Sequence, residues 1–278
     1  MDIRLLAMDL DGTSLQEDHL NFTPRLHQAL LEAHQQGVII VPNTGRQHNF
    51  LPPAVQTGAP WENLCVLCNG GEIRRIATGE LLKSHYISSD LAAEVIKLAG
   101  QYEVAVELSI QGHLHMSRDS LQKEEQLRHM LAFHLDHILP NYGVIVDDLS
   151  HTLASPEMHI EKINLVLPPD FSDQALSADL SRLPLSPCHS GPFTIEVTHQ
   201  NATKGNGLLD VCALLDIDPA QTMAIGDNGN DVSMLQAAGF SVAMGNAEPH
   251  IQSAAKAVTL PYNQDGAALA VERYILHK

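Results

Sequence analysis

The stretch that decides the fold lies near the start of the chain and reads Ile3-Arg4-Leu5-Leu6-Ala7-Met8-Asp9-Leu10-Asp11-Gly12-Thr13. Its apolar residues 3–8 predict a short buried strand that ends in an acidic, Gly-containing loop. We expect a helix next, because Thr23 can cap it, Pro24 suits its first turn and Gly37 can end it. A second apolar run at 38–41 completes a βαβ unit, which predicts a parallel sheet.

The last third of the chain repeats this alternation. It predicts a helix around 204–215, strands at 222–225 and 240–244 with a short helix between them, and helices near 248–256 and 265–276. The middle differs: it predicts a helix, a hairpin over 104–116, a long helix over 120–138, strands at 143–147 and 162–167, an acidic helix at 172–182 and a Pro- and Ser-rich connection at 183–192. We therefore predict the α/β class, with a Rossmann-like parallel-sheet core formed by residues 1–84 and 191–278 and an inserted α+β domain at 85–190.

The charge balance excludes some partners. The chain of 278 residues has 33 acidic residues against 16 Lys and Arg, a formal net charge of −17. Such a surface repels nucleic acid, and a small anionic substrate would need a local cation or a bound metal. No apolar run approaches the roughly 18 residues of a membrane span, and the N-terminal run is too short for a signal peptide. We expect a soluble, cytoplasmic protein with no nucleic-acid or membrane partner.

Cysteine and histidine offer little evidence for a metal site. Cys65 and Cys68 form a C-x-x-C pattern, but residues three apart on a strand point to opposite faces, so we expect two buried structural thiols. The 16 histidines are scattered. His129, His134 and His137 share one helical stretch without an acidic or cysteine partner at a recognised ligand spacing, so we interpret them as solvated or locally bonded.

Four stretches place chemically useful side chains at the expected ends of strands or the start of a helix, where open parallel sheets bind ligands. Asp9 and Asp11 lie two residues apart in one loop, so that one can attack phosphorus while the other transfers a proton. Thr44-Gly45-Arg46 supplies a hydroxyl and backbone amides for phosphoryl oxygens. Lys204 supplies a fixed cation, and the acidic loop at 226–231 suits a hard metal ion such as Mg²⁺. Phosphoryl transfer needs this combination.

In their order along the chain, these stretches resemble the four motifs of the haloacid dehalogenase superfamily, and within it the Cof-like phosphatases. The resemblance implies that Asp9 is the nucleophile and Asp11 the general acid/base. It implies that Thr44, Gly45, Arg46, Lys204 and Asn230 bind the phosphoryl group or substrate. It also implies that Mg²⁺ is held by Asp9, the backbone carbonyl of Asp11 and Asp227, with Asp231 in support. The inserted domain would be the α/β cap of that branch.

Two features depart from the family pattern: Asn43 stands where alanine is common, and Gly207 should loosen the helix after Lys204 by about 0.5–1 kcal/mol relative to Ala. The inserted domain carries no recognisable substrate signature. We interpret the polar residues near its expected strand ends as surface residues: Glu107, His113, His115, Arg118 and Asp147.

The resemblance implies a Mg²⁺-dependent phosphatase for a small phosphorylated metabolite, such as a sugar phosphate, acting through a phosphoaspartate as a monomer or homodimer. Three alternatives stay open. A signalling receiver domain is about half as long and has its acidic residues in a different order. A phosphomutase or phosphotransferase would keep all four motifs. A non-catalytic regulator that binds a phosphometabolite would not need both Asp9 and Asp11.

Overall fold

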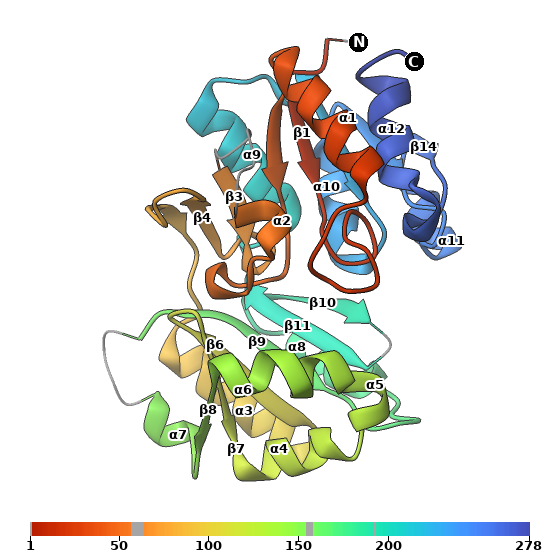
Figure 1. Cartoon of the computed structure of the whole chain (residues 1–278). Coiled ribbons are helices and arrows are strands. Elements are labelled where there is room, and N and C mark those ends of the chain that lie inside the picture. The colour runs from red at the N-terminus through yellow and green to blue at the C-terminus, as the bar shows by residue number, and fades with distance from the viewer. Residues whose placement is uncertain (1, 57–63, 154–157, 192) are drawn as a thin grey trace. The chain divides into compact units, whose positions relative to one another are not determined.

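The computed structural model describes residues 2–56, 64–153, 158–191 and 193–278, so Pro192 of the expected connection at 183–192 lies outside the described residues. Figure 1 shows the course of the chain. The chain divides into two compact units: residues 1–46, 51–84 and 203–278 form unit 1, and residues 47–50 and 85–202 form unit 2. No helix among the described residues is long and apolar enough to cross a membrane.

Unit 1 is built on a five-stranded parallel sheet in the order β14-β13-β12-β1-β2. Its strands are β1 (Leu5–Met8), β2 (Ile39–Pro42), β12 (Thr222–Gly226), β13 (Phe240–Ala243) and β14 (Ala257–Val258). Strand β1 lies between β2 and β12, so three neighbouring strands end at the same edge. Asp9 follows β1, Asn43 follows β2 and Asp227 follows β12.

Alternate side chains of β1 face two different helix layers. Leu6 and Met8 pack with the helix pair α1 (Pro24–Gln35) and α12 (Gly266–Tyr274), which lie side by side in Figure 1. Leu5 and Ala7 pack with α9 (Lys204–Leu215) and α10 (Val232–Ala237). The period of two along a strand thus gives a sheet covered on both faces, which is the predicted α/β class.

The predicted local signals for α1 are confirmed. The Thr23 side chain accepts a hydrogen bond from the backbone of Leu26, and Pro24 occupies the first helical position. Gly37 follows the helix with φ +88°, a conformation that glycine adopts without strain. The helix near 248–256 is shorter than expected, because α11 covers only Pro249–Gln252.

A second, smaller sheet completes unit 1. It is antiparallel and consists of β3 (Leu64–Leu67), β4 (Glu72–Arg75) and β5 (Leu81–Ser84), with α2 (Pro53–Gln56) before it in the chain. Cys65 lies in β3 and Cys68 in the short turn of helix after it; both are buried thiols that form no disulfide with another described residue. Burial raises the pKa of Cys65 to about 12, so it is an unreactive core residue as predicted.

Unit 2 contains a six-stranded sheet in the order β10-β11-β9-β6-β7-β8. The strands are β6 (Ala105–Ile110), β7 (His113–Ser117), β8 (Gly143–Val146), β9 (Ile160–Val166), β10 (Leu185–Gly191) and β11 (Thr194–His199). The predicted hairpin is β6 with β7. The helices α3 (Ser89–Gln101) and α8 (Gln174–Leu180) pack in an apolar layer with side chains of β6, β9 and β11.

The expected long helix over 120–138 was wrong. The segment breaks into α4 (Arg118–Glu125), α5 (Arg128–Phe133), a π-helical turn (His134–Ile138) and α6 (Leu139–Tyr142). Leu131 leaves the helical conformation at φ −105°, ψ 19°. The short helix α7 (Leu149–Thr152) follows β8.

The inserted unit ends later than expected. The Pro- and Ser-rich segment expected as a connection contains the strand β10, which pairs with β11, and β11 in turn pairs with β9. Unit 2 therefore runs to Ala202, compared with the expected boundary at 190. The segment 47–50 also belongs to unit 2, because the side chains of Gln47 and Asn49 bond to Glu161 and Gly112.

Candidate active site

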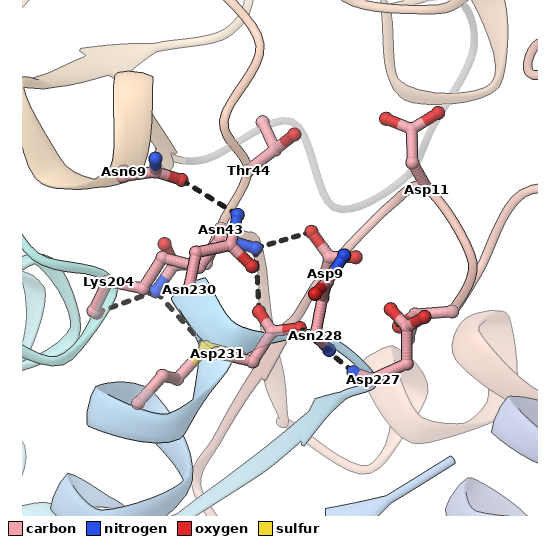
Figure 2. A network of polar contacts seen from close by, with 12 residues as sticks. Asp9, Asp11, Asn43, Thr44, Asn69, Lys204, Asp227, Asn228, Asn230 and Asp231 are labelled. Atoms are coloured by element: carbon pink, nitrogen blue, oxygen red, sulfur yellow. Dashed lines mark hydrogen bonds and ion pairs between the residues drawn. The ribbon is translucent and has the colours of Figure 1, made fainter. Parts of the chain in front are cut away.

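The centre of the candidate site is a buried lysine between two aspartates. Lys204, at the start of α9, has no exposed side-chain surface, and its Nζ lies 2.5 Å from Asp9 Oδ1 and 2.6 Å from Asp231 Oδ1. Figure 2 shows this arrangement. Since Asp9 follows β1 and Asp231 lies in the loop after β12, the parallel sheet brings residues more than 190 positions apart into one ion cluster.

Asp231 organises the loop that follows β12. Its Oδ2 accepts hydrogen bonds from the backbone amides of Asp227, at 2.8 Å, and Asn228, at 3.0 Å. Its other oxygen, Oδ1, pairs with Lys204. The arrangement is a capping box, which fixes the turn that presents Asp227.

Asp227 receives hydrogen bonds from two residues that the sequence did not single out. Thr13 Oγ1 donates to its Oδ1 and Asn246 Nδ2 donates to its Oδ2, both at 3.0 Å. The same Asn246 amide donates to the carbonyl of Gly12 at 3.0 Å. The acidic loop after β12 is thus tied directly to the loop that contains Asp9 and Asp11.

The cluster holds more negative than positive charge. Asp9, Asp227 and Asp231 each offer an oxygen within 4.8 Å of the others. Burial raises the pKa of Asp9 well above its usual range, an effect that Lys204 opposes and the charge of Asp231 adds to. Burial, and then the charge of Asp231, raises the pKa of Asp227 to about 7. One lysine does not balance these carboxylates, so the site favours an additional cation.

Asp11 is held by an arginine and a histidine. Arg46 donates to both of its carboxylate oxygens, with Nε 2.7 Å from Oδ2 and Nη2 2.6 Å from Oδ1, and His19 Nδ1 lies 2.8 Å from Oδ1. Burial acts to raise the pKa of Asp11, but the hydrogen bonds from Arg46 and His19 outweigh it and hold the pKa well below its usual range. In Figure 2 the Asp11 carboxylate points away from Asp9.

The loop after β2 is anchored by its backbone. Thr44 is buried, donates its amide to the carbonyl of Val66 at 2.9 Å, and accepts at Oγ1 a hydrogen bond from the amide of Arg46 at 3.2 Å. Gly45, between them, is half-buried. Asn43 donates through Nδ2 to the carbonyl of Lys204 at 2.9 Å, so this departure from the family pattern helps to hold the lysine in place.

Asn230, in the loop after β12, bonds to a residue that follows β3. Its Nδ2 donates to Asn69 Oδ1 at 3.2 Å, while its buried Oδ1 has no hydrogen-bond partner within the part of the chain that the structure describes. A polar atom in that state is suited to accept a hydrogen bond from a ligand hydroxyl. Asn69 belongs to the short helical turn Cys68–Gly70 after β3, at φ 56°.

Two glycines are required by close contacts. Gly12 has φ +74°, and a Cβ there would lie 2.5 Å from Asp227 Oδ2. A Cβ on Gly207 would lie 2.4 Å from Val66 Cγ1, so α9 packs against β3 at a distance that only glycine allows. The helix-loosening that Gly207 predicts is thus offset by this close packing.

The structure therefore gathers Asp9, Lys204, Asp227 and Asp231 in one cluster, with Asp11 and Arg46 paired beside them. Sequence reasoning missed His19, Thr13, Asn246 and Asn69. His19 lies in an irregular loop without any motif, whereas Thr13 follows Gly12 in the same loop as Asp9 and Asp11.

Comparison with known proteins identifies the fold family. A family model described as haloacid dehalogenase-like hydrolase matches residues 6–271. The chain belongs to the haloacid dehalogenase-like hydrolases. The predicted family, the α/β fold with its inserted α+β unit and the phosphatase class are confirmed.

Relatives of this haloacid dehalogenase-like hydrolase cover nearly its whole length. YxeH of Bacillus subtilis, which is named provisionally as a phosphatase, is 30% identical over 285 residues, and the match covers 99% of each of the two chains. YbjI of Escherichia coli, named 5-amino-6-(5-phospho-D-ribitylamino)uracil phosphatase, is 26% identical over 100% of this chain and 98% of its own. A solved structure from Bacteroides thetaiotaomicron, described among phosphatases of the haloalkanoate superfamily, matches with a TM-score of 0.81 and 25% identity over 98% of this chain and 94% of its own.

Proposed function

We propose that this enzyme hydrolyses a small phosphorylated metabolite, a sugar phosphate or similar phosphomonoester, with Mg²⁺ and through a phosphoaspartate on Asp9. The observation that carries the proposal is the buried pairing of Asp9 with Lys204 at 2.5 Å. Burial raises the pKa of the Asp9 carboxyl, and the charge of Lys204 opposes that rise and so favours the charged form. A charged carboxylate is the form that can attack phosphorus.

The donor set fits Mg²⁺. Asp9 and Asp227 provide hard carboxylate oxygens that lie close together, and the backbone carbonyl of Asp11 is the third ligand that the family resemblance implies. When bound, the ion would neutralise charge on the phosphoryl oxygens. Asp231 differs from the other predicted ligands, because both of its oxygens already accept hydrogen bonds from Lys204 or backbone amides. We assign it to positioning Lys204 and the loop that presents Asp227.

The residues of the chain then divide the work of the first step. Asp9 attacks phosphorus and the bond to the substrate oxygen breaks, while Lys204 offsets the charge on the nucleophile and on the phosphoryl oxygens. The Thr44 hydroxyl is suited to hold one of those oxygens, whereas the amides of Thr44 and Arg46 already donate within the protein. Asn230 Oδ1 is suited to accept a hydrogen bond from a hydroxyl of the substrate.

Asp11 must change partners to act as the acid. Its bond to the Arg46 guanidinium holds its pKa well below the usual range, so in this arrangement it carries no proton to give. We propose that substrate binding draws Arg46 towards the anionic phosphate and frees Asp11. A freed Asp11, whose pKa Arg46 no longer lowers, can take up a proton from solvent and pass it to the leaving oxygen, and afterwards take a proton from the water that attacks the phosphoaspartate.

The substrate class follows from the acidic character of the protein and from its relatives. With a net charge of −17, the chain favours a small anion that binds through Lys204 and a metal ion over a polyanion such as nucleic acid. The relative YbjI is named for a substrate with a phosphate on a ribityl chain. A phosphorylated polyol or sugar would also use the unpartnered acceptor of Asn230.

The experiment is a panel of sugar, polyol and nucleotide phosphates, assayed for release of inorganic phosphate with Mg²⁺, with a chelator, and with Mg²⁺ restored. We expect activity that disappears with the chelator and returns with Mg²⁺. Full activity after exhaustive chelation would contradict the metal assignment. Quantitative transfer of the phosphoryl group to a second sugar, with no free phosphate, would favour the phosphomutase alternative.

A further inference from the structure

Unit 2 has a second cluster of acidic and histidine side chains, which the proposed function does not use. One face of its sheet is polar: Glu107 of β6 lies opposite Asn164 of β9, and Asn164 lies opposite Glu196 of β11. This row is buried beneath α4 and α5, since Leu127 and Leu131 pack against Ala105 and Val166 of the same sheet. The expectation that Glu107 is a surface residue was therefore wrong, because only 2% of it is exposed.

Glu124 of α4 is directed into this row without any compensating hydrogen bond. It has no exposed surface, and neither carboxylate oxygen has a hydrogen-bond partner among residues 2–56, 64–153, 158–191 and 193–278. Burial, and then the charges of Glu107 and Glu125, raises the pKa of Glu124 to about 10. Two bare oxygens in a buried position are costly for a folded protein unless a ligand satisfies them.

His134 completes the cluster from a third segment. Its Nε2 lies 2.6 Å from Glu107 Oε1 and 3.8 Å from Glu124 Oε2. It begins the π-helical turn that interrupts the expected long helix, and π-helical turns are frequent at functional sites. The histidine thus does have acidic partners, but they come from other elements and are invisible in the local spacing.

We infer that Glu107, Glu124 and His134 form a binding site for a divalent transition metal, with Zn²⁺ as the best match. Each residue offers one ligand atom, and the three atoms lie within 4.8 Å of one another. Asn164 Nδ2 donates to Glu107 Oε2 at 2.7 Å and would orient that carboxylate as a supporting residue. The bound ion would join β6, α4 and the π-helical turn.

The donor chemistry favours zinc over magnesium. An imidazole nitrogen with two carboxylates suits Zn²⁺, which accepts mixed nitrogen and oxygen ligands at low coordination number. Mg²⁺ prefers oxygen ligands and keeps several waters, which a buried position disfavours. The cluster at Asp9 and Asp227 contains oxygen donors only, so the two sites should differ in metal preference.

The test is metal content and affinity in the full chain. Protein dialysed against buffered Zn²⁺ is analysed by elemental mass spectrometry, and affinity is measured by competition with a chromophoric chelator. The variants are Glu124→Gln and His134→Gln in unit 2, Asp227→Asn in unit 1, and Glu125→Gln as the matched control. Glu125 neighbours Glu124 on α4, but its side chain is exposed and pairs with Arg128.

We expect Glu124→Gln and His134→Gln each to lose one equivalent of Zn²⁺, with at least about a hundredfold loss of affinity at that site. Asp227→Asn should keep that equivalent, and Glu125→Gln should match the wild type. Added Zn²⁺ should raise the unfolding temperature of Asp227→Asn and lose this effect in the double variant with Glu124→Gln. The inference is overturned if Glu124→Gln binds as much Zn²⁺ as the wild type, or if all bound Zn²⁺ disappears in Asp227→Asn.

Discussion

Replacing Lys204 by methionine tests the electrostatic centre of the site. The change keeps an unbranched side chain of similar length and removes the charge that pairs with Asp9 at 2.5 Å and with Asp231 at 2.6 Å. Removing one partner of a buried ion pair costs about 3–5 kcal/mol, because the other partner stays buried and uncompensated. This loss of unfolding free energy is larger than that of most single substitutions, whether at the surface or in the core.

Protonation limits this loss. Protonating a carboxylate that has lost its partner costs about 1.4 kcal/mol for each pH unit above the ordinary aspartate pKa. At pH 7 this difference is about 3 units, so the variant should lose about 4 kcal/mol of unfolding free energy at that pH. The folded variant then binds a proton that the unfolded chain, with an ordinary aspartate pKa, does not. Its stability therefore rises as the pH falls, and the difference from the wild type should shrink to about 1–2 kcal/mol at pH 5. In the wild type, the raised pKa of Lys204 makes its contribution fully present below the ordinary lysine pKa and lost only in strong alkali.

The assay is urea unfolding of wild type and Lys204→Met at pH 7 and pH 5, with a chelator present so that no divalent ion replaces the lost charge. Lys83→Met is the matched control, because Lys83 pairs with Asp210 at 2.6 Å but keeps 42% of its side chain exposed. The control should lose at most about 1 kcal/mol at either pH. A loss below about 1 kcal/mol for Lys204→Met, or an equal loss at both pH values, would refute the reasoning.

Two further perturbations test the loop around the cluster. Gly12→Ala should destabilise the fold by about 1–2 kcal/mol and weaken Mg²⁺ activation, because residue 12 has φ +74° and the new Cβ would lie 2.5 Å from Asp227 Oδ2. Urea unfolding measures the first effect, and Mg²⁺ titration of the activity measures the second. Wild-type values in both assays would contradict the geometry. Arg46→Gln should raise the pKa of Asp11 towards its ordinary value, as measured by carbon NMR titration of the carboxyl group. The stability from this partly exposed pair, at most about 1 kcal/mol, is present above the unfolded aspartate pKa and is lost as the pH falls through the lowered pKa of Asp11 in the folded state. The variant should therefore be less stable than wild type at pH 7, and the difference should shrink as the pH falls below the ordinary aspartate pKa. An unchanged Asp11 titration would show that Arg46 does not control it.

The parallel core was predictable because its signals are local. Apolar runs at β1 and β2 ended at polar loops, and Thr23 with Pro24 marked the start of α1. The broken helix in unit 2 was not predictable in this way. Its stretch has no proline between residues 118 and 138, and the break depends on packing over a polar sheet face that no local pattern encodes.

The sequence predicted the charged residues of the candidate site, but not how these residues pair with one another and with their neighbours. Asp9, Lys204 and Asp227 follow from their positions at the ends of strands or the start of a helix. The pairing of Asp231 with Lys204 depends on how the loop after β12 turns. The clamp of Arg46 and His19 on Asp11 depends on an irregular loop, for which spacing along the chain gives no guide.

The central claim is that Asp9 carries the phosphoryl group and Asp11 moves the protons. Asp11→Asn tests both, because it keeps the backbone carbonyl and removes only the acid. With an aryl phosphate, whose phenolate leaves without protonation, we expect a burst of phenol about equal to the enzyme concentration, followed by slow turnover. Acid quenching during the slow phase, followed by mass mapping, should place one phosphoryl group on Asp9. Equal slowing of aryl and alkyl phosphates without a burst, or release of phosphate with no covalent label at Asp9, would contradict the account.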